Sequence, residues 1–425
     1  MNLHLFIANK MRSRGLSSLS NLISCISVAV SIAVIVVAIA ISNGFKKEIS
    51  SRAVGFSGEI VMTVPGSDYL NDEYPLDANL SYREDILSLD EIKALHNVAY
   101  KPGMLKSDDA VHGVLFKGVD SLYSFDFYSN HLTEGRMPDF SGAKLSNEVL
   151  ISQRLAQKMG YNLGDKLTVY FISGQVRVRR FDIVGLYNIQ LDDLDEKLIL
   201  ADIRQIRRLN GWKGEESSCI EVFLEQTGPM RSYYDRVLID NQIAQIIMNR
   251  DRDLDAPVAV TLIDNIFPSL FDWLGLLDLN VLVVLVLMIA VAGFNMISGL
   301  LIILFEKISM IGLLKSLGMR TWGICKVFMY KGSQIVLKGM LYGNIFAVAV
   351  LLVQKYTQII TLNPENYFVN FVPIDLSILQ WCVINVAAFA INMLIMAVPT
   401  LFISKVSPDK SIKVKDCGTT QGQTR

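Results

Sequence analysis

The chain has 425 residues, of which 51% are hydrophobic and 19% are charged, and its mean hydropathy is +0.37. This composition is too apolar for an ordinary soluble enzyme and too charged for a protein embedded wholly in lipid, so we expect membrane spans joined to a sizeable water-exposed domain. The net charge of −1 gives no indication of a nucleic-acid partner. Only one of the five cysteines, Cys219, lies in the long polar region, where it has no partner for an internal disulfide.

Residues 1–18 are typical of an amphipathic helix on a membrane surface. One helical face carries apolar side chains, and the segment is basic without any acid: Leu3, Phe6, Ile7 and Met11, with Lys10, Arg12 and Arg14. Such a helix binds the anionic inner leaflet of a membrane, so we predict that it lies on the cytoplasmic surface.

Four apolar runs are long enough to cross a membrane. The uncharged stretches 15–45, 279–305 and 376–404 each exceed the ~20 residues that a span needs. A fourth run is apolar except for Lys338, whose long stem can reach the interface from near one end of the span; a place in a transport path is the alternative for this lysine. The predicted spans are 19–45, 276–305, 328–354 and 377–403.

The distribution of lysine and arginine predicts the topology. Residues 1–14, residues 306–325 and the tail 404–425 are rich in basic residues, which indicates that they face the cytoplasm. Both termini are then cytoplasmic. Residues 46–270 and the loop 355–376 lie on the opposite side of the membrane.

The segment 46–270 has the pattern of an independently folded α+β domain. Strand patterns alternate with helix patterns, and Ser173-Gly174 is a hairpin turn signal. Ser88 with Glu91 has the spacing of a capping box, which predicts a helix over 89–98. The other predicted elements are a strand at 59–64, strand–helix units at 147–160 and 197–212, a hairpin at 165–187 and a helix at 233–249.

The domain carries no recognisable catalytic or metal motif. The four histidines are scattered, and the acidic cluster 191–196 lacks the glycine and ligand spacing of a calcium loop, so a solvated turn is favoured. We therefore predict no catalytic residue and no metal ligand. The sequence also lacks a phosphate-binding loop of the GxxxxGK[ST] type, so any ATP and magnesium must be bound by a partner chain.

A short amphipathic helix is predicted between the second and third spans. Its apolar residues Ile308, Ile311, Leu314 and Leu317 recur every three positions, and Gly318 follows as a helix end. A helix of this kind suits docking into a groove on a partner, and a helix resting on lipid is the alternative. Movement of a docked helix would be passed to the attached span.

The same region resembles the lipoprotein-releasing ABC permeases of the LolC/LolE family, within the type VII ABC superfamily that includes FtsX and MacB. The resemblance runs through Phe294-Asn295, Ser298-Gly299, Glu306-Lys307 and the stretch 311–318. Further similar segments occur in the same order along the chain: SNGFKKEI (42–49), VLISQRLAQKMGYNLGDKLTVYF (149–171), RRFDIVGLY (179–187), YFVNFVP (367–373) and VSPDKSIK (406–413).

The resemblance implies an integral membrane α-helical fold, with four transmembrane helices and a large α+β extracytoplasmic domain inserted between helices 1 and 2. It implies a multi-pass protein of the bacterial inner membrane whose partners are a LolD-like ATPase dimer, a second permease subunit, lipoprotein cargo and a LolA-like periplasmic carrier. The residues implied in ATPase coupling are Glu306, Lys307, Ile311, Leu314, Lys315, Leu317 and Gly318. The candidate residues of a substrate cavity are Ile35, Ile39, Phe45, Trp273, Val281, Leu285 and Phe371.

One departure from the family pattern concerns the hairpin at 170–181. It is short, whereas LolC-type subunits carry a longer hook that recruits the carrier, so this chain resembles a LolE-like subunit or one half of a homodimer. Two other functions stay open: a MacB-like efflux or mechanotransmission permease, and an FtsX-like regulator that signals to a periplasmic hydrolase.

Overall fold

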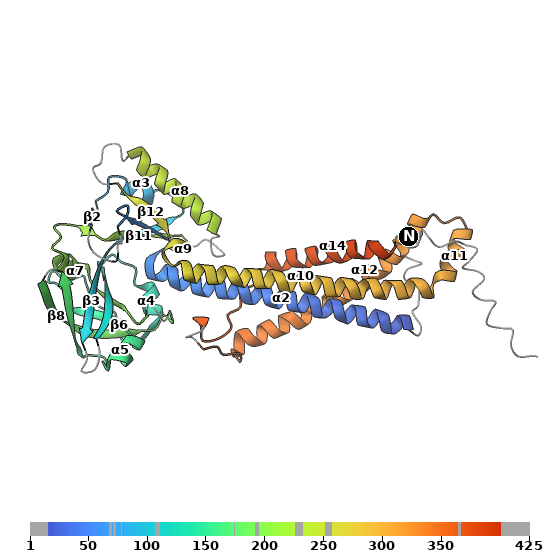
Figure 1. Cartoon of the computed structure of the whole chain (residues 1–425), viewed down its shortest axis with the longest axis horizontal. Helices are drawn as coiled ribbons and strands as arrows, with labels where there is room; N and C mark the ends of the chain where they lie inside the picture. Colours follow the sequence, from blue (N-terminus) through green and yellow to red (C-terminus); the bar gives the residue numbers. More distant parts are fainter. Residues whose placement is uncertain are drawn as a thin grey trace, which may run out of the picture. The chain divides into compact units, whose positions relative to one another are not determined.

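The computed structural model describes residues 16–67, 70, 74–77, 79–106, 111–173, 175–191, 195–225, 233–250, 257–363 and 367–400. The chain divides into two compact units (Figure 1). The membrane unit comprises Met1–Lys46, Leu274–Thr361 and Phe371–Arg425, and the domain unit comprises Lys47–Trp273 with Leu362–Asn370. The predicted surface helix at 1–18, apart from its last residues, and the tail 404–425 lie outside the described residues.

Four helices of the described chain are long and apolar enough to cross a membrane. They are α2 (Leu16–Ser57), α10 (Pro268–Glu306), α12 (Thr321–Thr357) and α14 (Ile378–Thr400). The number of spans is as predicted, and the first is separated from the other three by the domain segment. The helices α2 and α10 run beyond their apolar stretches, because their outer ends, 47–57 and 268–273, belong to the domain unit.

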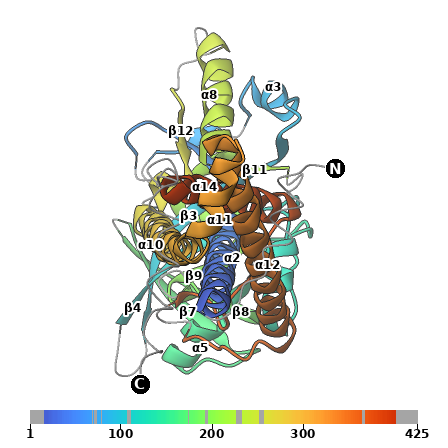
Figure 2. The same ribbon diagram turned by 90° about the vertical axis from the view of Figure 1, so that its right-hand side faces the viewer.

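Small residues bring the helices of the membrane unit close together. Viewed along the helices in Figure 2, α2 lies between α10 and α12. A Cβ atom on Gly339 would lie 2.8 Å from the carbonyl oxygen of Cys25, and one on Gly343 would lie 2.4 Å from that of Ala29, so the GxxxG face of α12 packs directly on α2. On the other side of α2, Gly299 of α10 faces the Ser24 hydroxyl.

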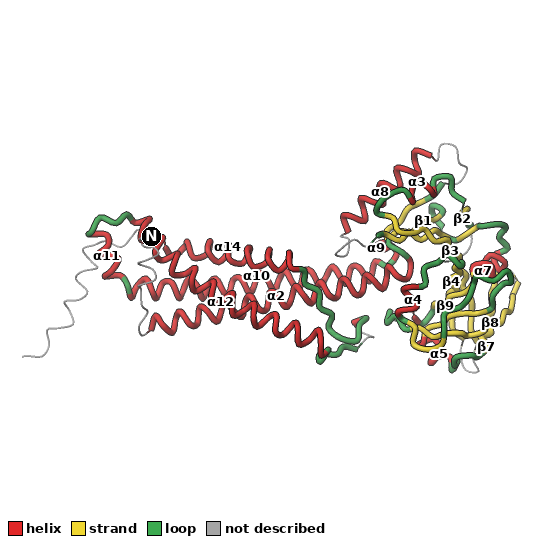
Figure 3. The backbone as a smooth tube through the Cα atoms, turned by 180° about the vertical axis from the view of Figure 1, so that it is seen from behind, coloured by secondary structure: helices red, strands yellow, loops and turns green. Residues whose placement is uncertain are grey.

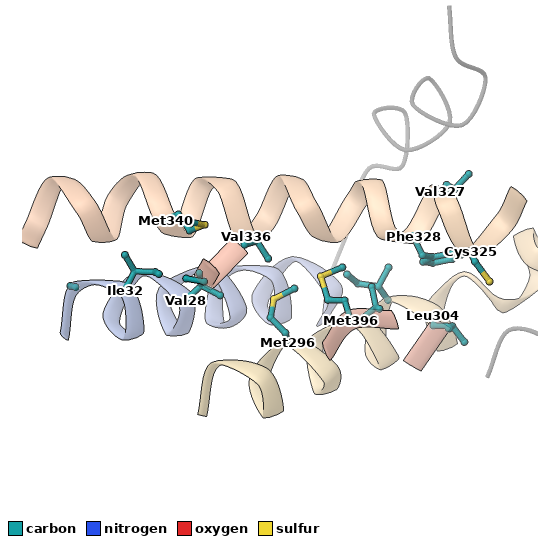
Figure 4. Close-up of a cluster of buried hydrophobic side chains, with 14 of the residues drawn as sticks. Val28, Ile32, Met296, Leu304, Cys325, Val327, Phe328, Val336, Met340 and Met396 are labelled. Carbon is teal, nitrogen blue, oxygen red and sulfur yellow. The ribbon is translucent and has the colours of Figure 1, made fainter. Parts of the chain in front are cut away.

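The apolar core of the membrane unit is built from all four spans and the short helix between α10 and α12. Figure 4 shows Met296, Met396, Val336 and Met340 with Val28 in this cluster. Flexible methionine side chains fill the irregular gaps that glycines leave between helices: a Cβ on Gly332 would lie 1.6 Å from the Met396 methyl group.

Replacing Gly343 by alanine is expected to destabilise the membrane unit by about 1–3 kcal/mol, because the added methyl group overpacks the contact with Ala29. This loss should occur although alanine has the higher helix propensity. The matched control is Gly275→Ala in α10, where an added Cβ meets nothing within 4 Å. Thermal unfolding of the detergent-solubilised chain measures both, and equal stability of the two variants would contradict the packing described.

All named strands belong to the domain unit, as Figure 3 shows in yellow. The main sheet has the order β12-β1-β11-β3-β4-β9-β6-β8-β5, and β7 pairs with both β3 and β8. The strands are β1 (Ile60–Thr63), β3 (Ile92–Lys106), β4 (Val111–Val119), β5 (Leu132–Gly135), β6 (Glu148–Ser152), β7 (Lys166–Ser173), β8 (Gln175–Tyr187), β9 (Leu198–Asp202), β11 (Cys219–Leu224) and β12 (Ala259–Leu262), with β2 (Leu76–Asp77) and β10 (Glu216–Ser217) forming a separate pair.

Six helices of the domain unit are described: α3 (Arg83–Leu87), α4 (Asp126–Asn130), α5 (Gln153–Met159), α7 (Ile203–Asn210), α8 (Tyr233–Arg250) and α9 (Ile263–Ile266). The two predicted strand–helix units are confirmed as β6–α5 and β9–α7. The Ser152 side chain caps α5 by accepting from the Leu155 amide, and Gly160 ends the helix with φ +74°. Asp202 and Gly211 have the same roles in α7.

The predicted helix over 89–98 is wrong. Ser88 is the C-cap of the short helix α3, and residues from Ile92 onward form the long strand β3. This strand pairs with β11 on one side and with β4 further along, and it buries Leu95 and Val98 in the sheet core. A capping-box spacing is a weak local signal, and pairing on both edges of the strand overrides it.

Candidate functional site

The segment between α10 and α12 contains a helix of nine residues, α11 (Ile308–Ser316). The backbone hydrogen bonds continue across its junction with α10, since the Lys307 amide donates to Ile303 O (3.1 Å) and the Ile311 amide to Lys307 O (3.0 Å). Gly318 has φ +84° and ends the helix, and the Met319 amide donates to Leu314 O. This unbroken ladder connects α11 to the end of the spanning helix α10.

The apolar stripe predicted for α11 divides between two faces. Ile311 is fully buried in the core of the membrane unit and Leu314 packs partly against it, whereas Leu317 is 76% exposed. The reason is geometric. Residues three apart in sequence are offset by 60° around a helix. The nine residue steps from Ile308 to Leu317 make two and a half turns, so the stripe ends on the side of the helix opposite to its start. Leu313, 58% exposed, lies four residues before Leu317 on this open side.

Further exposed apolar side chains and charges lie next to α11 in the chain. Phe305 precedes the helix and Trp322 follows it, and both are largely exposed. Lys307 forms an ion pair with Glu306 (2.7 Å), and the Lys326 ammonium lies 5.8 Å from the Trp322 ring centroid. Exposed apolar side chains accompanied by charges are typical of a protein-docking surface.

The seven candidate cavity residues do not line one open surface of this chain. Ile35 and Phe45 are buried inside the chain, while Ile39, Val281, Leu285 and Phe371 are half-buried; Trp273 is also half-buried but belongs to the domain unit, where its ring lies 5.9 Å from Phe368. Other apolar side chains of α10 are exposed on a face of the helix different from that of Val281 and Leu285. They include Leu276, Leu279, Val283, Val286, Leu287 and Phe294.

Within the described part of the domain unit, no group of three or more metal-binding side chains occurs. The hairpin β7–β8 is short, with only residue 174 between the ends of the two strands. Of the acidic cluster at 191–196, residues 192–194 lie outside the described residues, while Glu196 pairs with Arg154 (2.9 Å) and Lys158 (2.5 Å).

A buried ion pair at the centre of the sheet escaped the sequence analysis. Lys117 of β4 and Glu221 of β11 lie 2.8 Å apart, and both side chains are fully buried. Burial raises the pKa of Glu221, while the Lys117 ammonium and the Tyr100 hydroxyl, which donates to the carboxylate (2.9 Å), oppose that rise. Lys117 also donates to the carbonyl oxygen of Phe56, in the last turn of α2.

Arg52 is the second link between α2 and the domain fold. Its guanidinium donates to Ile189 O (2.8 Å), Gln190 Oε1 (2.7 Å) and Phe368 O (3.1 Å), and it pairs with Glu48 one turn earlier in the same helix. Since Arg52 is largely buried, these bonds fix the outer end of α2 to two loops of the domain unit. No local sequence pattern marks Arg52 or Lys117, because their partners lie far away in the chain.

His96, next to this cluster, gives the domain unit a pH-dependent stability. Burial, with the nearby Lys117, Arg83 and Lys93, lowers the pKa of His96 to about 4, and its Nε2 is buried without a hydrogen-bond partner. The unfolded chain binds this proton at a pKa near 6.5, so the stabilisation is complete above that pH and is lost as pH falls towards 4.

Between pH 7.5 and 4.5 we therefore expect the wild type to lose about 2 kcal/mol of domain stability more than a His96→Gln variant does, because glutamine does not titrate. Denaturant unfolding of the full chain at a series of pH values measures the difference. Parallel pH profiles for the two proteins would show that His96 titrates alike in both states.

Comparison with known proteins supports the class that this architecture indicates. Residues 282–408 match the family model of the FtsX-like permease C-terminal region, and residues 22–230 match that of the MacB-like periplasmic core domain. The chain is also similar to two solved structures. The periplasmic region of MacB from Actinobacillus actinomycetemcomitans has 15% identity and a TM-score of 0.33, and the match covers 51% of this chain and 94% of that one. The extracellular domain of the transporter YknZ from Gram-positive bacteria has 16% identity and a TM-score of 0.32, and the match covers 48% of this chain and 100% of that one. The two family matches, with the four apolar helices, are those of a membrane permease of the FtsX and MacB type.

Curated relatives match over nearly the whole length. The lipoprotein-releasing system transmembrane protein LolC of Neisseria meningitidis is 22% identical, over 95% of this chain and 96% of its own length. LolE of Haemophilus influenzae is also 22% identical, over 91% and 92%. The chain is thus similar over nearly its whole length to the LolC and LolE permeases of lipoprotein-releasing systems, and it carries the FtsX-like permease C-terminal region and the MacB-like periplasmic core domain.

Proposed function

We propose that this chain is the transmembrane permease subunit of an ABC transporter that extracts lipoproteins from the bacterial inner membrane and passes them towards a periplasmic carrier. The observation that carries the proposal is the similarity to LolC and LolE proteins over both the domain unit and the spans. In this proposal the chain is not an enzyme. ATP and magnesium are bound by a LolD-like ATPase dimer.

The open side of α11 is the proposed contact with that ATPase. Leu313 and Leu317 offer an apolar surface, while Ile311 anchors the helix in the membrane unit. The hydrogen-bonded junction with α10 supports transmission, because a push on α11 then moves the span without first melting a loop. The coupling segment in this proposal also includes Glu306, Lys307, Lys315 and Gly318. The nucleotide is bound by the ATPase and not by these residues.

Extraction needs energy from ATP because acyl chains are held strongly by the bilayer, at about 0.8 kcal/mol for each buried CH₂ group. A cavity for acyl chains forms in this proposal between two permease subunits, with α2 and α10 as its walls. The exposed apolar face of α10 supports a contact with a second subunit or with acyl chains. The cavity residues predicted from the sequence are less exposed than this face, since two of them are buried and five are half-buried within one chain.

In this proposal both termini and α11 lie in the cytoplasm and the domain unit lies in the periplasm, which the excess of lysine and arginine in the cytoplasmic segments supports. The short β7–β8 hairpin supports a LolE-like subunit, or a homodimer that recruits its LolA-like carrier through another surface. A MacB-like efflux permease is the second candidate, because the MacB-like core model matches residues 22–230.

Depletion of the chain in its host tests the proposal against this alternative. Lipoprotein release predicts that mature lipoproteins accumulate in the inner-membrane fraction when the chain is depleted, and that wild-type chain restores their distribution. Efflux predicts an unchanged distribution of lipoproteins together with increased sensitivity to an exported compound.

A further inference from the structure

A groove lies between α2, near the end at which that helix begins, and the first half of α12. It has a volume of about 350 Å³. Its walls combine apolar side chains with amides and two lysines: Leu19, Asn21, Leu22 and Cys25 of α2, and Lys331, Gln334, Ile335 and Lys338 of α12. The groove narrows at one end where Gly339 packs against Cys25.

The two lysines of the groove have no acidic partner in the bundle. The sequences of α12 and α14 contain no acidic residue, nor does α2 before Glu48 or α10 between Asp278 and Glu306. Among the ion pairs of the described chain, none includes Lys331 or Lys338. An ammonium group at membrane depth is costly without a counter-charge, and none of the described residues of the bundle supplies one to Lys331 or Lys338.

The spacing of the lysines fits a phospholipid headgroup. They are seven residues apart, which is nearly two turns, so they share a face of α12 and stand about 10 Å apart along the axis. Lys331 lies at the edge of the apolar run, and Lys338 lies two turns inside it with a stem long enough to reach towards the interface. Leu19 and Leu22, both more than half exposed, supply an apolar edge for acyl chains.

We infer that this groove binds the phosphate of an anionic phospholipid from the cytoplasmic leaflet, with Lys331 and Lys338 as its counter-charges. Basic pockets between spanning helices on the cytoplasmic side are a recurring form of such sites. The inference rests on the proposed orientation of the chain but not on its cargo.

The test is native mass spectrometry of the full chain in detergent, titrated with phosphatidylglycerol or with phosphatidylcholine of the same acyl chains. We expect phosphatidylglycerol to bind more tightly. Lys331→Gln or Lys338→Gln should weaken it about 5-fold each, and the double variant about 25-fold. Lys331→Arg with Lys338→Arg should retain the preference. The matched control is Lys355→Gln, at the other end of the same helix, which should bind as the wild type does.

Equal binding of the two lipids, or a double glutamine variant that binds as the wild type does, would overturn the inference. Displacement of phosphatidylglycerol by millimolar inorganic phosphate would also overturn it, since the site would then recognise free phosphate. The assay needs neither ATPase nor lipoprotein, so its failure is distinct from a failure of the release function.

Discussion

Changing Leu313 and Leu317 together to aspartate is expected to abolish ATP-driven transport while leaving the chain folded. Both side chains project largely into solvent on the open side of α11, so charges there cost little stability. At an interface with the ATPase, two buried leucines are worth about 2 kcal/mol each, so the double change should weaken binding of the ATPase about 1,000-fold. Co-purification of the ATPase with the chain measures this loss.

The matched control is Ile359→Asp, an equally exposed apolar residue on the loop after α12, which should leave ATPase binding unchanged. Ile311→Asp differs from both, because Ile311 is fully buried and an unpaired carboxylate there should unfold the membrane unit. An L313D/L317D chain that still binds the ATPase would show that the docking surface is not on α11.

Replacement of Lys117 by methionine is the second change with a large expected effect. It leaves the Glu221 carboxylate buried without its cation and removes a donor from the Phe56 carbonyl at the end of α2. Loss of one partner of a buried pair costs about 3–5 kcal/mol, which approaches the whole stability of many domains. Denaturant unfolding of the full chain measures the loss, and Lys93→Met on the exposed face of β3 is the control.

Two further results separate the ion pair from simple packing. The double variant Lys117→Met/Glu221→Met should recover much of the lost stability, because no unpaired charge remains. The deficit of Lys117→Met should also shrink as pH falls from 8 to 5, since burial raises the pKa of Glu221 and the variant lacks the ammonium group that opposes this rise. A deficit that is constant over this range would mean that packing, and not charge, holds the cluster together.

Local signals in the sequence predicted the elements whose causes are local. The strand–helix units follow from a capping residue before the helix and a glycine after it, as at Ser152 and Gly160. The spans follow from composition alone. The helix predicted over 89–98 failed because Leu95 and Val98 lie in a strand that pairs with β11, which no local pattern reveals.

The candidate site was predicted only in outline for the same reason. The position of α11 followed from its apolar residues and Gly318, but the side that is open depends on how α11 packs against α12, and this packing buries Ile311 and leaves Leu317 exposed. The links that Arg52 makes to Ile189 O and Lys117 makes to Glu221 carry no local signal, since these partners lie more than a hundred residues away.

Lipoprotein release by this chain is measured most directly as transfer in proteoliposomes. The chain is reconstituted with its ATPase and with every permease subunit that co-purifies from the host, in vesicles that contain a triacylated lipoprotein. We predict ATP-dependent appearance of the lipoprotein on a soluble carrier, and its disappearance with the L313D/L317D chain. ATP hydrolysis that depends on the chain but moves no lipoprotein would contradict a role of the chain in lipoprotein release.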